Sequence, residues 1–247
     1  MSEVRVQNEV DVEQGYFIEG VPGVGLASKI ATDHVIDRLD MTLHATVKAD
    51  GLPEVMIFQE GERGLRPPVR IFVDEDTGLY AFTSDVLISP VDVEGFADLI
   101  VDWLEENSVT PLLLSGLPSD VGEDEEKQLY GVGTGGADDI LEQAGIDAPD
   151  RTGLIGGPTG AMMHEAADRG LDAVGLVAET NPQFPDPIAA QLLLDDGVEQ
   201  IVGFDVDTEV LAEQAEQIRE QKQKLAEMIQ NAEQHERSQA YPEGMYQ

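Results

Sequence analysis

Short apolar segments alternate with amphipathic segments along residues 15–206, and turns that contain glycine separate them. The segments "GYFIEG", "TPLLLSGLP" and "LDAVGLVAET" have the length and composition of buried strands. In "VDVEGFADLIVDWLEENS", residues such as Phe96, Ile100 and Trp103 recur at helical spacing on one face. This alternation predicts an α/β layered domain with a largely parallel sheet.

Local patterns add further elements to this domain. The segment "VRIFVDEDTGLYAFTSD" predicts two strands joined by an Asp-Glu-Asp-Thr-Gly turn, a β-hairpin. The segment "EVMIFQ" predicts another strand, and "ADDILEQAG" predicts a short helix closed by Gly145. For "VGEDEEKQLYGVGTG" two interpretations stay open, an exposed excursion or a pair of strands.

The C-terminal part differs from the domain at residues 1–206. Residues 207–237 lack glycine and proline and keep apolar residues at 3–4 spacing, which predicts a long helix with Thr208 as its N-cap. This helix either packs along its own domain or projects into an oligomer and carries the tail outward. Residues 238–247 contain Pro242 and Gly244, and we expect a flexible tail there.

Acidic residues greatly outnumber basic ones. The chain has 50 Asp and Glu against 14 Lys and Arg, a formal net charge of −36. The acids are spread through every segment, which favours adaptation to molar salt, where the Debye length falls to ~3 Å, over an acidic partner-binding surface. The composition therefore implies a halophile's cytoplasm, and it argues against nucleic-acid binding, which needs a basic face.

Several classes of site and location are not expected. The chain has no cysteine, which excludes disulfides and thiolate chemistry, and its four histidines lack the spacing of metal ligands. The N-terminus does not resemble a signal peptide, and no apolar run approaches the ~20 residues of a membrane span. We expect a cytoplasmic protein without a membrane segment, a metal or a cofactor.

Two glycine-containing turns are candidate anion sites. The first holds Gly20, Pro22, Gly23, Gly25 and Lys29. Its spacing fits neither nucleotide-binding glycine motif, so a tight turn that brings helix and sheet together is the favoured interpretation. The second precedes a helix and is the better candidate, because several backbone amides there could point at one ligand.

The second turn consists of Gly156, Gly157, Thr159 and Gly160. The sequence contains no complete set of nucleophile, base and orienting residue, so no catalytic residue is predicted.

The last three residues form a candidate partner-binding motif. Met245 can fill a small apolar pocket, and Tyr246 offers a ring and a hydroxyl donor. The terminal carboxylate of Gln247 can pair with a lysine or a group of backbone amides on a partner. A disordered end without a partner is the alternative.

The ordered set of motifs resembles the proteasome assembly chaperone family in its archaeal, here haloarchaeal-type, form, over about residues 15–230. The matching motifs are Pro22-Gly23-Val24-Gly25 with Lys29, Gly156-Gly157-Pro158-Thr159-Gly160, Glu179-Thr180 and Pro185-Asp186-Pro187. The resemblance implies a three-layer α/β/α sandwich, nucleoside-phosphorylase-like, without a known catalytic role. It also implies homo-oligomers with C-terminal helices.

Some members of that family end in a hydrophobic-Tyr-X tail, which docks between α-subunits of the proteasome core particle and can favour gate opening. Met245-Tyr246-Gln247 matches this tail. The first hypothesis is therefore a non-enzymatic proteasome assembly chaperone or activator. The alternative is a small-molecule or nucleotide-handling enzyme of phosphorylase-like fold that uses the turn at Gly156–Gly160.

Overall fold

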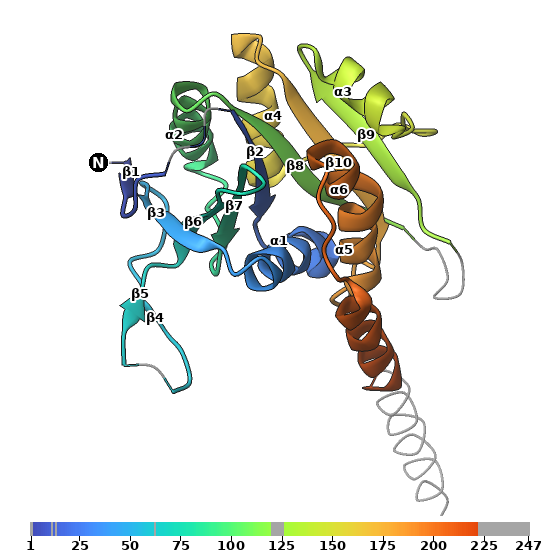
Figure 1. The fold of residues 1–247 in the computed structure, drawn as a ribbon, viewed down its shortest axis with the longest axis horizontal. Coiled ribbons are helices and arrows are strands. Elements are labelled where there is room, and N and C mark those ends of the chain that lie inside the picture. The colour runs from blue at the N-terminus through green and yellow to red at the C-terminus, as the bar shows by residue number, and fades with distance from the viewer. Residues whose placement is uncertain (1, 11, 13, 62, 120–125, 222–247) are drawn as a thin grey trace, which may run out of the picture.

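The computed structural model describes residues 2–10, 12, 14–61, 63–119 and 126–221, which fold around an eight-stranded sheet (Figure 1). Across the sheet the strands lie in the order β1-β3-β6-β7-β2-β8-β10-β9. Their bounds are β1 Glu3–Val6, β2 Gly15–Gly20, β3 Thr42–Lys48, β6 Val69–Asp74, β7 Leu79–Ser84, β8 Val109–Pro118, β9 Leu129–Thr134 and β10 Ala173–Thr180.

The four central strands, β7, β2, β8 and β10, are parallel to one another. Antiparallel strands extend the sheet on both sides, β6, β3 and β1 beyond β7, and β9 beyond β10. The predicted parallel sheet therefore corresponds to the centre of a mixed sheet. The predicted hairpin is confirmed as β6 and β7, and Asp74 stabilises its turn by accepting hydrogen bonds from the Thr77 amide and hydroxyl at 2.9 and 2.6 Å.

Helices cover both faces of the sheet. One face carries α1 (Ala27–Arg38), α3 (Ala137–Ala144), α5 (Pro187–Leu193) and α6 (Glu199–Val202), and the other carries α2 (Val93–Glu106) and α4 (Gly157–Arg169). Successive side chains of a strand point to opposite faces. In β8, Leu112 and Leu114 therefore join the core under α1 and α5, while Leu113 joins the core under α2 and α4.

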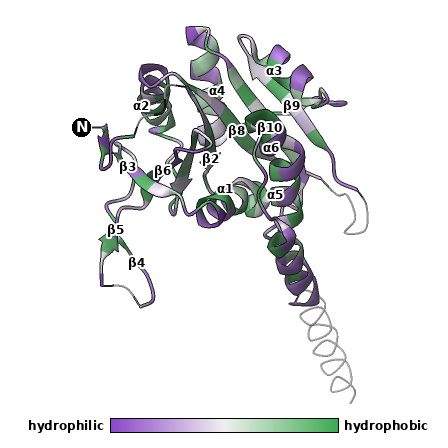
Figure 2. Ribbon diagram, in the orientation of Figure 1, coloured by the Kyte–Doolittle hydropathy of each residue, from purple (hydrophilic) through white to green (hydrophobic). Residues whose placement is uncertain are grey.

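This double burial explains why successive residues of the central strands are largely apolar, and Figure 2 colours much of β8 and β10 as hydrophobic. The predicted helix at Val93–Glu106 is confirmed, and so is the one closed by Gly145, which has φ 71°. The segment "EVMIFQ" forms a much shorter strand than predicted, β4 (Ile57–Phe58). β4 pairs with β5 (Leu65–Arg66) in a separate two-stranded sheet.

The C-terminal helix begins on the body and then leaves it (Figure 1). Residues 209–221 are helical. Thr208 lies before this helix, where its hydroxyl accepts from Gln191 and donates to Asp195, both at 3.2 Å, and the buried Leu211 joins the core. The predicted continuation to 237 and the tail 238–247 lie outside the described residues.

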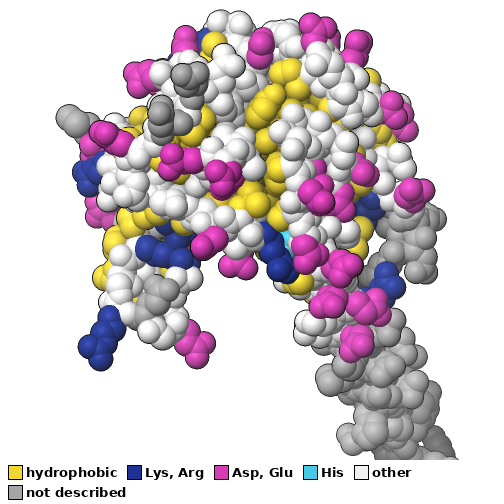
Figure 3. Space-filling view, viewed as in Figure 1, with side chains coloured by type: hydrophobic (Ala, Val, Ile, Leu, Met, Phe, Trp, Pro, Cys, Tyr) yellow, Lys and Arg dark blue, Asp and Glu magenta, His cyan; other side chains and the backbone are white. Residues whose placement is uncertain are grey.

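Acidic side chains are spread over the face shown in Figure 3, in keeping with their distribution along the sequence. Within the ranges that the structure describes, no helix combines the length and the apolar character needed to cross a membrane. The same ranges contain no group of three or more histidine and carboxylate side chains placed to hold a metal ion.

Candidate functional site

The family-type motifs of the described chain gather at one edge of the sheet, around the carboxyl ends of β7, β2, β8 and β10. The first glycine turn follows β2, Thr180 ends β10, and the second glycine turn begins α4. This edge is where open α/β sheets bind their ligands. The polar contacts of each motif show whether its groups are free for a ligand or used within the fold.

The first turn is packed tightly against β10. Gly25 has φ 60°, and a Cβ on it would lie 2.8 Å from both the Asn181 carbonyl oxygen and the Thr180 hydroxyl. Its carbonyl oxygen accepts a hydrogen bond from the Asp186 amide at 2.8 Å. Gly23 has more room, because the nearest atom to its Cβ position is 3.8 Å away. The turn therefore packs the carboxyl end of β2 against that of β10, which supports its interpretation as a packing turn.

Asp186 connects this turn to the helix that follows it. Its Oδ1 accepts from the Ala189 amide at 3.1 Å and caps α5, while Pro187 occupies the first turn of that helix. Its Oδ2 accepts from the Asn181 amide at 2.7 Å and pairs with Lys127. The Pro-Asp-Pro motif is thus a helix start with a buried cap.

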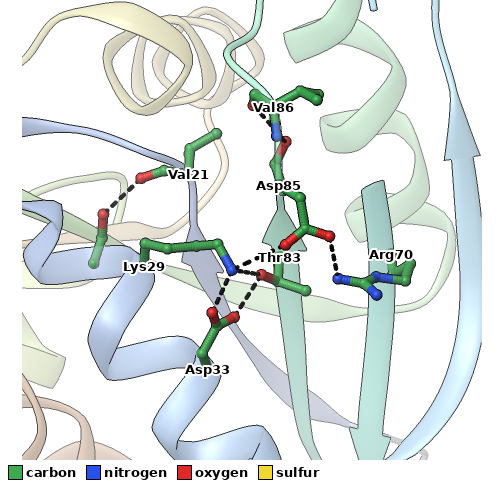
Figure 4. A network of polar contacts seen from close by, with 9 residues as sticks. Val21, Lys29, Asp33, Arg70, Thr83, Asp85 and Val86 are labelled. Carbon is green, nitrogen blue, oxygen red and sulfur yellow. Dashed lines mark hydrogen bonds and ion pairs between the residues drawn. The ribbon is translucent and has the colours of Figure 1, made fainter. Parts of the chain in front are cut away.

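Lys29 extends from α1 towards β7 (Figure 4). Its Nζ contacts Asp33, donates to the Thr83 hydroxyl at 3.0 Å and lies 3.4 Å from Asp85 Oδ1. Thr83 in turn donates to Asp33 Oδ1 at 2.7 Å. Lys29 therefore forms ion pairs with two carboxylates of its own chain, Asp33 and Asp85. These contacts direct its ammonium group towards β7 and away from the glycine turn beside it.

Arg70 completes this network from the neighbouring strand β6. Its Nη2 donates to Asp85 Oδ2 at 2.7 Å, and its guanidinium lies 5.7 Å from the centre of the Phe72 ring. Arg70 is buried, with 4% of its surface exposed, and this burial lowers the pKa of its guanidinium. Its Nε and Nη1 have no hydrogen-bond partner among the described residues.

The second turn has open space beside Gly156 and Gly157, its tip, whereas Thr159 and Gly160, its base, contact other groups of the fold. Gly157 has φ 63°, and neither it nor Gly156 would bring a Cβ within 4 Å of another group. Gly160, in contrast, would place a Cβ against the Ile155 carbonyl. The Thr159 hydroxyl is buried and donates to Glu19 Oε1 on β2. One of the predicted ligand-binding groups is therefore used to hold α4 against the sheet.

Glu19 is the most unusual titratable group at this edge. Its side chain is 0% exposed, and burial raises the pKa of its carboxyl group to about 8, although hydrogen bonds from Thr159 and the Val21 amide oppose this shift. Glu19 is therefore mostly protonated at neutral pH. Its Oε2 has no hydrogen-bond partner among the described residues.

Comparison with known proteins identifies the family. The family model described as PAC2 family matches residues 17–226. The chain belongs to the PAC2 family. An uncharacterized protein of Methanocaldococcus jannaschii is 28% identical over 221 residues, which cover 89% of this chain and 88% of that protein.

Two solved structures from Pyrococcus furiosus are similar to this PAC2 protein. PbaA, described as an archaeal homolog of proteasome-assembly chaperone, is 28% identical with a TM-score of 0.79, and the match covers 96% of this chain and 97% of PbaA. PbaB, described as an archaeal proteasome activator, is 21% identical with a TM-score of 0.78, covering 91% and 98%. The mixed α/β fold is thus the fold of PAC2 structures.

Sequence patterns did not identify Glu19, Arg70 or Asp85 of this PAC2 protein as candidate site residues. A signal existed for two of them, because Glu19 and Arg70 are single charged residues inside the apolar strands "GYFIEG" and "VRIFV". Charged residues are rarely fully buried unless they are paired or neutral. The predicted partner-binding residues Met245, Tyr246 and Gln247 lie outside the described residues.

Proposed function

We propose that this PAC2 protein is a non-enzymatic proteasome assembly chaperone or activator, which docks its C-terminal tail on the α-subunits of the proteasome core particle. One observation carries the proposal: a chain of this family ends in Met245-Tyr246-Gln247, a hydrophobic-Tyr-X sequence. PbaA and PbaB, with their proteasome-related descriptions, support the same assignment.

Self-association is part of this proposal. A three-residue anchor binds weakly by itself, but several anchors on one oligomer raise each other's effective concentration and give avidity. The helix at 209–221 leaves the body and would carry the tail away from it (Figure 1). We place this homo-oligomer in the cytoplasm of a halophilic archaeon, consistent with the net charge of −36.

Co-purification with the core particle in molar salt tests the proposal. Deletion of Tyr246 and Gln247 is expected to abolish binding, and Tyr246→Ala is expected to weaken it at least about tenfold, because the ring and hydroxyl are lost. Tyr241→Ala is the matched control, since it removes a tyrosine from the same tail five positions earlier. Binding that survives the deletion would contradict the proposal.

One observation favours the alternative, a small-molecule or nucleotide-handling protein of phosphorylase-like fold. The tip of the second turn is open at Gly156 and Gly157, and the buried Glu19 has an oxygen atom without a partner among the described residues. A thermal-shift panel of phosphate, nucleosides and nucleotides in molar salt tests it, because a ligand stabilises the folded state. Absence of any shift would remove this alternative.

A further inference from the structure

A short β-arm, residues 52–66, stands away from the body between β3 and β6 (Figure 1). Its strands β4 and β5 pair only with each other among the described residues. An isolated two-stranded hairpin is marginally stable in water unless another surface packs against it. Within the described ranges, no third strand joins this pair to fix its position.

One face of the arm is apolar and exposed. Phe58 and Leu65 lie directly opposite each other in the β4–β5 pair, so their side chains share this face. Phe58 is 80% exposed and Leu65 is 63% exposed. Val55 and Met56, just before β4, are exposed as well. Figure 2 colours β4 as hydrophobic.

The loop at residues 85–92 carries further exposed apolar side chains close to the base of the arm. A Cβ on Gly51 would contact the side chain of Asp92, so the base of the arm lies against this loop. Leu87 and Val91 of the loop are largely exposed. Arm and loop together hold six of the eleven large hydrophobic side chains exposed in the described part of the chain, which is a gathering and not a scatter.

The charge of the arm differs from that of the body. Residues 52–66 hold three glutamates and two arginines, whereas the chain has 50 acidic against 14 basic residues. Arg63 is exposed near the far end of the arm. In Figure 3, Lys and Arg side chains gather with hydrophobic ones on the arm, and acidic side chains dominate much of the remaining face.

We infer that the arm is an association element that packs on a second copy of this chain. Two bodies of the same strong negative charge repel each other wherever salt does not screen them, so an interface between copies is favoured at a contact where that charge is low. The arm meets this need, and its phenylalanine, methionine and arginine are residue types enriched at protein interfaces. The acidic body of a second copy is the charge complement of Arg63. This inference rests on the self-association included in the proposed function.

Light scattering on the full-length protein in molar KCl tests the arm. The unaltered protein is expected at a multiple of its chain mass of 26.7 kDa. The double variant Phe58→Asn with Leu65→Asn is expected at 26.7 kDa, with association weakened at least about 100-fold, because the two central apolar contacts are lost. Its circular dichroism is expected to stay unchanged, because both side chains are exposed in the single chain.

Leu154→Asn is the matched control, since Leu154 is 96% exposed but lies outside the arm, and this variant is expected to stay associated. Arg63→Glu is expected to weaken association more at low salt than at high salt, because salt screens exposed charges. A double variant that keeps the mass of the unaltered protein would overturn the inference. So would an unaltered protein that is a single chain at all concentrations, or equal dissociation by Leu154→Asn.

The two proposals can fail separately. An associated protein that ignores the core particle would overturn the proposed function and leave the arm inference standing. If the core particle binds the unaltered protein but the arm variant stays associated, the arm inference would be overturned and the proposed function would stand.

Discussion

The two glycine turns at the carboxyl edge of the sheet look alike in sequence but are constrained differently. At the first turn, Gly25 has no space for a side chain, because β10 lies directly against it. At the second turn, Gly156 and Gly157 face open space, and the constraint at Gly157 is a backbone with φ 63°. A glycine motif in this fold therefore marks either close packing or a backbone turn.

The difference bears on function. A turn packed on both sides has its groups engaged within the chain, as the contacts among Gly25, Thr180 and Asp186 show. An open turn leaves room for another molecule, although here its Thr159 hydroxyl is engaged by Glu19. The first turn is thus a structural element, and the second is the place where a ligand or partner could still approach.

The largest effect is expected at the first turn. Gly25→Val would place its Cβ 2.8 Å from the carbonyl oxygen of Asn181, just after β10, in a left-handed conformation that branched residues avoid. We expect a loss of more than about 5 kcal/mol in the free energy of unfolding, or no cooperative folding at all. Denaturant unfolding in molar salt measures it.

Gly23→Ala is the control for this prediction. Gly23 has an extended backbone, with φ −136°, and its nearest contact would be 3.8 Å away. We expect a change within about 0.5 kcal/mol, as for an unconstrained surface position. A mild effect of Gly25→Val would remove the contrast between the turns.

A smaller effect is expected where the second turn meets the sheet. The pKa of Glu19 is raised from 4.5 to about 8 in the folded protein, so between these values the folded state holds a proton that the unfolded state has released. The stabilisation from this proton is complete below about pH 4.5 and is lost as the pH rises to about 8. Glu19→Gln removes the proton exchange and should remove this dependence.

Unfolding free energies of both proteins across this pH range measure the effect. We expect the difference between them to shift by a few kcal/mol in favour of Glu19→Gln as the pH rises, since one pKa unit corresponds to about 1.4 kcal/mol. Glu94→Gln, the same substitution at an exposed position of α2, serves as the control. Parallel curves for Glu19→Gln and the unaltered protein would mean that Glu19 is already ionised in the fold.

Local patterns were sufficient to predict much of the fold. The β6–β7 hairpin follows from a turn sequence between two apolar segments, and α2 follows from an apolar face that includes Phe96 and Ile100. Gly145 closes α3 with φ 71°, as expected of a glycine at a helix end. These features depend on residues that are close in the sequence.

The arm and the contacts of the candidate site could not be predicted in this way. The segment "EVMIFQ" has strand composition, but only Ile57–Phe58 pairs, because the partner strand β5 is as short. Glu19 meets Thr159 across 140 positions, and Lys29 meets Thr83 across 54. Such contacts depend on the order of strands in the sheet, which no local pattern specifies.

The smallest effect is expected at the tip of the second turn. It distinguishes the cost of an unfavourable backbone conformation from the cost of a steric clash. Gly157→Ala should cost about 1 kcal/mol, because alanine disfavours φ 63° but meets no atom within 4 Å. Gly156→Ala, at φ −120°, should change the free energy of unfolding by less than about 0.5 kcal/mol. If Gly157→Ala instead cost as much as Gly25→Val, the space beside this turn would be filled in the protein in solution. Since no group of the described chain lies within 4 Å of that Cβ position, a ligand, a second copy or a residue outside the described ranges would then have to fill it.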